Sequence, residues 1–283
     1  MPPHAIVTCC DARFGDFLLG HWLVSLRANV DLSGVDVVVL DYGLTDAQRH
    51  ALTGQDVLVF PCERDGVVSN VRYRDICRLL DQRDYDQILS VDGGDVIFQA
   101  DIRALFDQHV DQFRAVPEEL QIPFHDLLIR RSDLDAERFG EILAFLHDKP
   151  MVNAGVLLGP ARKFREFWHF YQNTSRAFDC FGMDQLLLNY VLYRDGFVPL
   201  DHGYNWVLVT ASSRYSVRDG VFLDARGHVI PVVHNAGNVD TMRAVREFGY
   251  GTGRNHRRRW VRLRIRLLMA QGWLSRLTRK LRK

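Results

Sequence analysis

The stretch Ile88-Leu89-Ser90-Val91-Asp92-Gly93-Gly94-Asp95-Val96-Ile97-Phe98 decides how this chain folds. It begins with an apolar run, rich in β-branched residues, that is typical of a buried strand. Asp92 and Asp95 follow the run, and the two glycines between them allow a backbone or a ligand to approach closely. Carboxylate oxygens at a strand end suit Mg²⁺ or Mn²⁺. A tight Asp-Gly turn between two strands is the alternative interpretation of the same residues.

Strand-like and helix-like segments alternate along the chain on both sides of this stretch. Short apolar runs predict strands, and apolar residues at helical spacing predict helices between them. We expect strands at residues 5–10, 35–40, 57–60, 88–91, 151–158 and 229–233, and helices at 14–26, from 45 onward, and at 71–80, 161–171 and 183–193. This alternation predicts an α/β fold with a largely parallel sheet. Residues 109–149 show no readable pattern.

Aspartates stand at the ends of three expected strands. Asp11 ends the first, Asp41 the second, and Asp92 and Asp95 the fourth. Because ligands gather beyond the carboxyl ends of parallel strands, we expect these carboxylates to share one crevice. Capping of the following helix is the alternative role of Asp11. No G-x-G-x-x-G follows the first strand and no P-loop motif occurs, which argues against dinucleotide enzymes and P-loop ATPases.

The net charge of +1 conceals an uneven distribution of charge. Residues 254–283 hold 12 of the 36 Lys and Arg and none of the 35 Asp and Glu, which leaves a net charge of −11 on residues 1–253. An acidic body with a basic tail predicts contact with an anionic surface. Five cysteines without a C-x-x-C pair indicate a reducing compartment rather than a zinc site or a disulfide framework. Without a secretory leader or an apolar run of about 18 residues, we expect a cytoplasmic protein.

The basic tail has the pattern of an amphipathic helix. Apolar residues three and four apart form a stripe from Trp260 to Leu281, and arginines and lysines flank it. This pattern predicts that Trp260–Lys283 lies among anionic lipid headgroups, with the protein peripheral on the inner face of the cell membrane. A short coiled coil and a helix docked on the acidic body are the alternatives. We expect no nucleic-acid partner, because the tail has few polar side chains that read bases.

Several stretches, in this order along the chain, resemble one family. They are similar to segments of the retaining GT-A glycosyltransferases of family 8, the group of glycogenin and the bacterial lipopolysaccharide galactosyl- and glucosyltransferases. The similar segments are Cys10–Phe14, Val39–Leu44, Leu89–Ile102, Asn153–Leu158, Asp184–Asn189 and His234–Gly237. The resemblance implies a GT-A fold, a Rossmann-like mixed and mostly parallel sheet flanked by helices. It implies a catalytic domain at 1–247, with a nucleotide-binding half at 1–107 and an acceptor-side half at 108–247, and a tail at 248–283.

The resemblance also implies roles for particular residues. Three are expected to bind Mn²⁺ or Mg²⁺: Asp92, Asp95 and His234. Six are expected to bind the UDP-sugar donor: Asp11, Phe14, Asp41, Arg74, Asn153 and Gly237. Two are expected at the reacting centre: Asp184 and Gln185. Within these sets Asp11 would bond to uracil and Phe14 would stack on it, and Asn153 and Asp184 would hold sugar hydroxyls while Gln185 lies near the reacting carbon.

Three departures from the family pattern concern the charged groups of this site. One is that Leu186 stands where the family's Asp-Gln-Asp has its last Asp. The carboxylates are spaced D-x-x-D, so Gly93 aligns with the first Asp of the family's D-x-D. Either Asp92 supplies the ligand from one position earlier or the metal has one ligand fewer. The family's Lys-Pro-Trp after H-x-x-G is also missing. A cation for the diphosphate would then come from one of three arginines: Arg74, Arg78 or Arg243.

The resemblance therefore implies a metal-dependent hexosyltransferase that uses UDP-glucose or UDP-galactose. It would extend a lipid-linked glycan such as lipopolysaccharide, O-antigen or capsule, with retention of configuration. One alternative is an inverting GT-A enzyme, which needs a carboxylate base within reach of the acceptor hydroxyl. Another is a non-catalytic sugar-nucleotide-binding or membrane-scaffold subunit. Acceptor recognition is expected in residues 109–149 and 200–230, and the oligomeric state is not indicated.

Overall fold

The structure, a computed structural model, describes residues 3–119, 133–176, 178–211, 215–237 and 243–253, and also residues 263, 267 and 270. The strands are β1 (His4–Cys10), β2 (Val35–Asp41), β3 (Leu58–Pro61), β4 (Gln87–Asp92), β5 (Val96–Phe98), β6 (Arg114–Pro117), β7 (Val152–Pro160), β8 (Val198–Pro199), β9 (Trp206–Val207), β10 (Ser216–Arg218), β11 (Val221–Leu223) and β12 (Val232–His234). The helices are α1 (Gly15–Phe17), the π-helix η1 (Leu18–Trp22), α2 (Leu23–Asn29), α3 (Asp46–Thr53), α4 (Val68–Leu80), α6 (Ala136–Leu146), α7 (Ala161–Thr174) and α8 (Met183–Asp195), with 3₁₀ turns η2 (Arg103–Asp107) and η3 (His202–Asn205).

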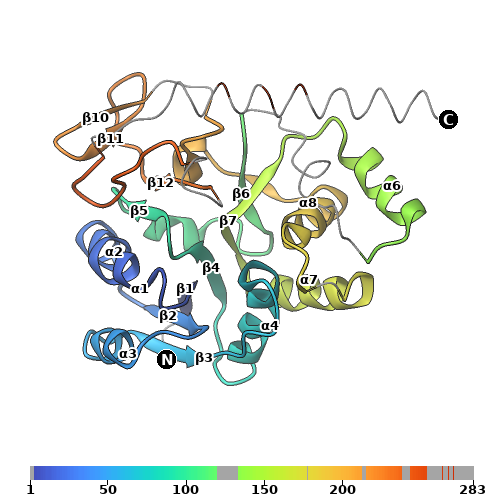
Figure 1. Ribbon diagram of the computed structural model, residues 1–283, viewed down its shortest axis with the longest axis horizontal. Helices are drawn as coiled ribbons and strands as arrows, with labels where there is room; N and C mark the ends of the chain where they lie inside the picture. The colour runs from blue at the N-terminus through green and yellow to red at the C-terminus, as the bar shows by residue number, and fades with distance from the viewer. Residues whose placement is uncertain are drawn as a thin grey trace.

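A seven-stranded sheet in the order β3-β2-β1-β4-β7-β6-β8 forms the centre of the molecule. β1 lies between β2 and β4 and runs parallel to both, and β3 continues this parallel set. β7 runs antiparallel to its neighbours β4 and β6. Helices α4, α7 and α8 lie together beside this sheet (Figure 1). The observed sheet confirms the predicted α/β fold, mixed and mostly parallel.

Both faces of the central strands are buried, which explains their continuous apolar sequences. In β1, Ala5 and Val7 pack into the core that α4, α7 and α8 cover. Ile6, between them, points to the opposite face and packs with residues of η1, α2 and α3. Successive side chains of a strand point to opposite faces, so one apolar run supplies two cores.

The structure differs from the expected elements in two places. The helix expected at 14–26 is divided into α1, the π-helix η1 and α2. The last strand, expected at 229–233, begins only at Val232. Pro231 has no N–H group for a strand ladder, and Val229 before it makes only an isolated bridge with Leu223.

A smaller sheet in the order β5-β12-β9 lies beside the central one. β5 follows β4 directly in sequence, whereas β12 comes from near the end of the described chain. Their antiparallel pairing sets His234 opposite Val96, and the Asn235 N–H donates to the Asp95 carbonyl oxygen at 2.9 Å. Figure 1 shows β5 and β12 together, next to the β10–β11 hairpin. The pairing therefore brings two distant sequence segments to one place.

Several further expectations can be compared with the structure. None of the five cysteines, all of which lie in the described part of the chain, forms a disulfide bond. Among the described residues, no helix has the length and apolar character needed to cross a membrane. Most of the predicted tail helix Trp260–Lys283 lies outside the described residues, but Leu263 and Leu267 are helical and exposed, at 50% and 56%. The division into halves at 1–107 and 108–247 stays a prediction, and strands of both halves belong to the central sheet.

We expect the buried Arg114 to be important for stability. Its side chain is fully buried in β6 and donates to the backbone carbonyls of Leu105 and Gln108 and to the Gln87 amide oxygen. Arg114→Ala would leave these acceptors without a donor and should lower the free energy of unfolding by about 3 kcal/mol or more. Urea denaturation measures this loss. The exposed Arg165, paired with Asp81, provides the control, and a loss in Arg165→Ala equal to that in Arg114→Ala would contradict the prediction.

Candidate functional site

Asp92, Asp95 and His234 form a cluster at the carboxyl end of β4. One ligand atom from each of the three lies within 4.8 Å of the others. The His234 Nε2 atom is 3.4 Å from Asp95 Oδ1 and 3.7 Å from Asp92 Oδ2. The sequence predicted these three residues as metal ligands, and the structure brings them together. Asp92 therefore does reach the cluster from one position before the family's first Asp.

The His234 ring is held in one orientation. Its Nδ1 atom is 3.0 Å from Asn205 Oδ1, and Asn205 in turn donates from Nδ2 to the Asn153 carbonyl. With Nδ1 protonated towards Asn205, Nε2 is the nitrogen that faces both carboxylates. Burial opposes a charge on His234, but the carboxylates of Asp95 and Asp92 raise its pKa above the ordinary value.

The donor set fits a divalent cation. Two carboxylate oxygens and the imidazole Nε2 atom face one another, with His234 buried and the two aspartates partly exposed. Once His234 has lost its Nε2 proton, all three atoms are acceptors, and such a group is stabilised by a cation between its members. Mixed oxygen and nitrogen ligands suit Mn²⁺, with Mg²⁺ as the alternative.

Two glycines leave the space that the cluster needs. A Cβ atom at Gly155 would lie 2.4 Å from His234 Cε1 and 2.7 Å from Asp92 Oδ2. A Cβ atom at Gly93 would lie 2.5 Å from Thr8 Oγ1. No side chain fits at either position without displacing its neighbours. The family's first Asp therefore has no room at position 93, and the D-x-x-D spacing follows from this packing.

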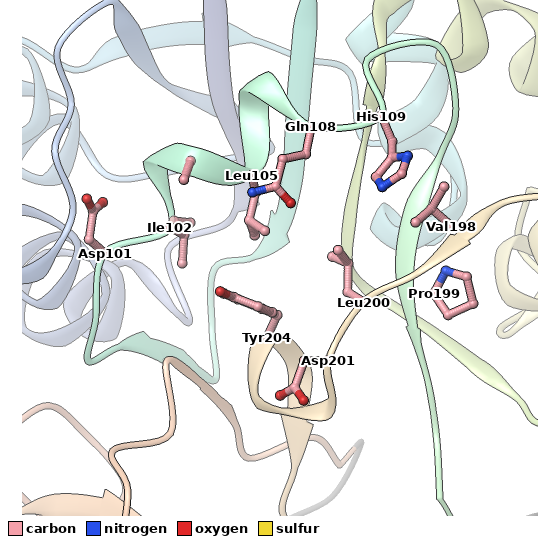
Figure 2. Close-up of a pocket in the computed structure, with 11 residues that line it drawn as sticks. Asp101, Ile102, Leu105, Gln108, His109, Val198, Pro199, Leu200, Asp201 and Tyr204 are labelled. Atoms are coloured by element: carbon pink, nitrogen blue, oxygen red, sulfur yellow. The ribbon is translucent and has the colours of Figure 1, made fainter.

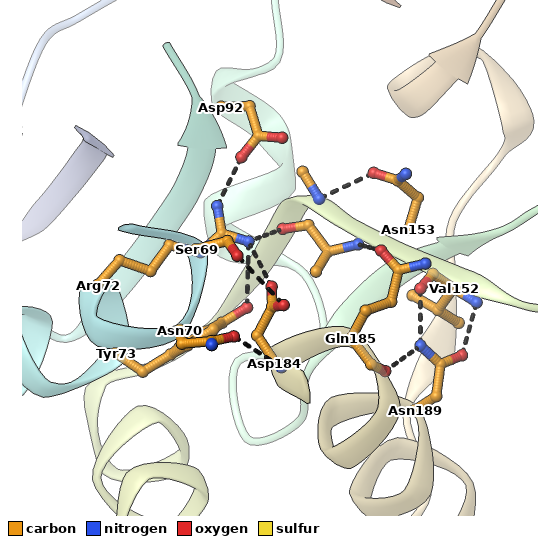
Figure 3. A network of polar contacts seen from close by, with 12 residues as sticks. Ser69, Asn70, Arg72, Tyr73, Asp92, Val152, Asn153, Asp184, Gln185 and Asn189 are labelled. Carbon is orange, nitrogen blue, oxygen red and sulfur yellow. Dashed lines mark hydrogen bonds and ion pairs between the residues drawn. The ribbon is translucent and has the colours of Figure 1, made fainter. Parts of the chain in front are cut away.

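Arg72, on α4, connects the cluster to the predicted reacting centre (Figure 3). Its Nη1 atom donates to Asp92 Oδ1 at 2.6 Å. Its Nη2 atom donates to the Ala154 carbonyl at 2.8 Å and lies 3.5 Å from Asp184 Oδ2. The guanidinium group is 3% exposed, so this network fixes Asp92 and Asp184 relative to each other.

The structure contradicts the expectation that Arg74 faces the site. Its guanidinium group is engaged by Asp65, Asp75 and the Glu63 carbonyl, none of which belongs to the cluster. Residues two apart on an α-helix are separated by about 200°, so Arg72 and Arg74 point to opposite sides of α4. Arg78 likewise pairs with Asp75.

The sequence did contain a signal that Arg72, rather than Arg74, faces the cluster. Arg72 stands four residues before Ile76 and seven before Leu79, both of which are fully buried. This spacing places the three residues on one helix face. An arginine on an apolar helix face needs acceptors inside the protein, which Asp92 and Asp184 supply.

Asp184 and Gln185 lie in the first turn of α8, and Asp184 contacts Arg72. Ser69 Oγ donates to Asp184 Oδ1, and the Asp184 N–H donates to Asn70 Oδ1. Burial raises the pKa of Asp184, and Arg72 offsets part of this effect. The Gln185 side chain accepts weakly from the Ala154 N–H, at 3.4 Å, and both residues are nearly buried. Asp184 is therefore connected to the cluster through Arg72, and Gln185 contacts the backbone of Ala154, the residue before Gly155.

The residues predicted to bind the base lie on the β1 side of the site. The Phe14 ring lies close against Gly94, where a Cβ atom would be 2.8 Å away, and the Arg243 guanidinium carbon is 5.8 Å from the ring centroid. Asp11 accepts from the Arg13 N–H at 3.0 Å and pairs with Arg64 at 2.8 Å. Phe14 and the Asp95 segment are therefore neighbours, as the prediction requires.

Asp41, Asn153 and Gly237 have local roles in the structure. Asp41 accepts from the N–H groups of Gly43 and Leu44, so its carboxylate closes the turn after β2. These contacts do not support a role of Asp41 in nucleotide binding. Asn153 Oδ1 accepts from the Gly155 N–H at 2.9 Å, which shapes the glycine position under the cluster. The Gly237 carbonyl accepts from Arg243 Nε at 3.3 Å.

Sequence reasoning missed Glu118, which follows β6. Its side chain is 4% exposed, and neither carboxylate oxygen has a hydrogen-bond partner of good geometry among the described residues. Burial raises its pKa to about 7, and favourable interactions with Thr210, His234 and Asn153 offset only part of this cost. The sequence signal for Glu118 was its position as an acidic residue directly after a strand, in residues 109–149, where no pattern could be read.

A separate pocket of about 230 Å³ lies between η2 and the segment from β8 to η3 (Figure 2). Apolar side chains such as Leu200 and the carboxylates of Asp101 and Asp201 line it, and the Tyr204 side chain extends towards Ile102. None of its lining residues belongs to the metal cluster. It does approach the cluster through η3, because Asn205 follows Tyr204 and contacts His234.

We expect Gly155→Ala to disrupt the cluster. The added methyl group would overlap His234 and Asp92, and Mn²⁺ binding should weaken by roughly tenfold or more. Isothermal titration with MnCl₂ measures the affinity, and circular dichroism checks the fold. Gly140, on α6, has nothing within 4 Å of the position that an added methyl group would take, so Gly140→Ala is the control. Unchanged Mn²⁺ affinity in Gly155→Ala would show that the cluster does not hold the metal.

Glu118 should make stability depend on pH. Its ordinary pKa of 4.5 rises to about 7 in the folded protein, so the wild type loses stability as pH increases between these values. Glu118→Gln should therefore unfold like the wild type near pH 4.5 and be more stable by up to about 3 kcal/mol above pH 7. Urea denaturation at several pH values tests this, with the neighbouring exposed Glu119→Gln as control. An equal difference at all pH values would refute it.

Comparison with known proteins supports the fold. No known protein-family profile and no curated protein matches the sequence. A crystal structure of the galactosyltransferase LgtC, in complex with donor and acceptor sugar analogs, is 18% identical with a TM-score of 0.53, over 94% of this chain and 95% of that chain. The structure of an LgtC active-site mutant matches over the same shares, at 18% identity and a TM-score of 0.54. The chain therefore has the fold of LgtC, which confirms the predicted GT-A architecture.

Proposed function

We propose that this protein is a metal-dependent glycosyltransferase that transfers a hexose from UDP-glucose or UDP-galactose to a lipid-linked glycan. The observation that carries the proposal is the convergence of Asp92, Asp95 and His234 at the carboxyl end of the sheet, in a fold shared with a galactosyltransferase. Ligands of open α/β sheets bind at this edge. The departing group of such a reaction is a nucleotide diphosphate, whose negative charge needs a counterion.

The cluster would hold Mn²⁺ or Mg²⁺ through Asp92, Asp95 and His234. When bound, the cation would neutralise the charge that develops on the departing diphosphate. The protein's own contribution is to orient the ligands. Arg72 fixes Asp92 through Oδ1, which leaves Oδ2 towards His234, and Asn205 keeps His234 Nε2 towards both carboxylates.

Residues next to the cluster would bind the donor. Phe14, on the Gly94 side, would stack on the uracil base, and Asp11 would bond to its edge. Asp184 is held by Arg72 and Ser69 next to the cluster, a suitable position for binding sugar hydroxyls. Asn153 and Gln185, whose side chains accept hydrogen bonds from the Gly155 and Ala154 N–H groups, would contribute amide groups to binding of the donor sugar. Fixed polar groups of this kind reduce the reorganisation that the reaction requires.

We propose retention of configuration for the transferred sugar. The carboxylate of Asp184 is already engaged by Arg72 and Ser69, so it is poorly placed to act as the base of an inverting enzyme. Glu118, the buried acid without a hydrogen-bond partner of good geometry in the described structure, is the residue that an inverting mechanism would use. NMR of the first-formed glycoside determines its anomeric configuration, and an inverted product would replace the retaining mechanism with the inverting one.

The acceptor would bind on the side of the Tyr204 pocket. Four of its eleven lining residues belong to the segments where acceptor recognition is expected: His109, Leu200, Asp201 and Tyr204. The pocket also combines apolar walls with carboxylates, as sugar-binding surfaces often do. A lipid-linked acceptor would also require the protein to lie at a membrane. The predicted basic amphipathic tail fits this requirement, with the protein peripheral on the inner face of the cell membrane.

Asp95→Asn tests the enzymatic proposal. Replacing one charged ligand should lower Mn²⁺-dependent transfer or hydrolysis of UDP-glucose and UDP-galactose by roughly a hundredfold. Released UDP is measured in a coupled assay with each donor. The exposed Asp111→Asn variant serves as control because Asp111 makes only a surface ion pair with Arg162. Wild-type protein that binds UDP and Mn²⁺ without any turnover would indicate the non-catalytic subunit instead.

Two exposed leucines test the membrane proposal in the 283-residue chain. Leu263→Asp combined with Leu267→Asp should abolish co-sedimentation with phosphatidylglycerol vesicles, because it places acids on the apolar stripe of the tail. Val24, 46% exposed on α2, supplies the control Val24→Asp. Binding should also fall as salt increases and be absent from neutral vesicles. Retained binding in the double variant would refute attachment through the tail.

A further inference from the structure

Each carboxylate of the metal cluster is shared between His234 and an arginine. Asp92 faces His234 through Oδ2 and Arg72 through Oδ1. Asp95 faces His234 through Oδ1, and its Oδ2 lies 3.6 Å from Arg243 Nη2. Each cluster carboxylate thus has a cationic partner when no metal ion is present, although Arg72 is shared with Asp184. A divalent cation that enters alone would meet carboxylates that are already compensated.

The two arginines are held very differently. Arg72 is 3% exposed and has three acceptors, on Asp92, Asp184 and Ala154. Arg243 is 23% exposed, and its contacts are the long ion pair with Asp95, a 3.3 Å hydrogen bond to the Gly237 carbonyl and the nearby face of Phe14. Arg72 cannot leave without depriving the buried Asp184 carboxylate of its charge partner. Arg243 can change its partner at small cost.

The backbone near Arg243 is nevertheless anchored beside the cluster. The buried Asn235 donates from its N–H to the Asp95 carbonyl and binds both the N–H and the carbonyl of Val245 through its side chain. Ala244 and Val245 are themselves buried. Arg243 therefore carries a partly exposed, weakly held side chain on an anchored backbone, and this side chain contacts Asp95 and the Phe14 ring.

We propose that Arg243 is an exchangeable counterion: it pairs with Asp95 in the free protein and moves to the diphosphate when nucleotide and cation bind. This inference rests on the proposed function. The diphosphate brings the negative charge that Arg243 then neutralises, and Asp95 becomes fully available to the cation. Cation and nucleotide consequently bind with positive coupling, since each removes an unfavourable interaction of the other.

The coupling can be measured by binding alone. Titrations of MnCl₂ into the free protein, and of UDP into protein with and without saturating Mn²⁺, give the coupling factor. In Arg243→Gln, Mn²⁺ alone should bind about threefold to fivefold tighter, the range expected on removing one partly exposed competing charge. UDP with Mn²⁺ should bind roughly tenfold weaker because a charged hydrogen-bond donor is lost. The coupling factor should therefore fall.

Two further variants separate this role from its alternatives. Arg243→Lys retains the charge and should keep most of the coupling, and it also guards against misfolding of the glutamine variant. Arg246→Gln, an exposed position three residues away, should leave both affinities unchanged. If Arg243→Gln weakens UDP binding but leaves the affinity for Mn²⁺ alone as in the wild type, Arg243 is a fixed phosphate ligand and the exchange is refuted. If the wild type binds neither Mn²⁺ nor UDP, the proposed function itself fails.

Discussion

The antiparallel pairing of β5 with β12 is the constraint on which the candidate site depends. β5 begins one residue after Asp95, and β12 ends at His234. Their register sets His234 opposite Val96, and the Asn235 N–H closes the ladder on the Asp95 carbonyl. A slip of one residue would turn the imidazole to the other face of the small sheet. Backbone hydrogen bonds, rather than attraction between charged groups, therefore determine that the ligands meet.

The packing around this pairing keeps several like-charged groups close together. An unpaired carboxylate at the buried Asp184 would be costly, and Arg72 compensates Asp184 and the partly exposed Asp92 from a fixed position on α4. Gly155 leaves the volume that His234 and Asp92 occupy. The result is a preorganised set of acceptors whose outer oxygens are held by arginines and whose inner atoms face one another. Asp92 and Asp95 each contact His234 through one oxygen and an arginine through the other. A site in which a metal ion replaces an arginine as counterion requires this arrangement.

The central strands were predicted correctly because their apolar sequences are a local signal. The strands at β1, β2 and β4 are apolar on both faces, and their ends carry the aspartates that the structure places at one edge of the sheet. The choice between Arg72 and Arg74 was harder, because both are arginines on one helix and only the face that covers the sheet distinguishes them. The spacing of four and seven residues from the buried Ile76 and Leu79 would have identified Arg72 as the arginine on the face of α4 that covers the sheet. Asn205 and Glu118 had no comparable pattern, since their partners lie on other strands and turns.

The sequence by itself determined the alternation of strands and helices, the carboxylates after β4 and the cationic tail pattern. These depend on local properties, namely the period of apolar residues, the composition of a turn and the sign of charge. Only the tertiary structure decided which groups meet. Position 93 has no room for a side chain beside Thr8, Asp41 is used by its own turn, and Arg243 stands next to Asp95. Each of these facts depends on packing and pairing between distant segments, which local sequence does not specify.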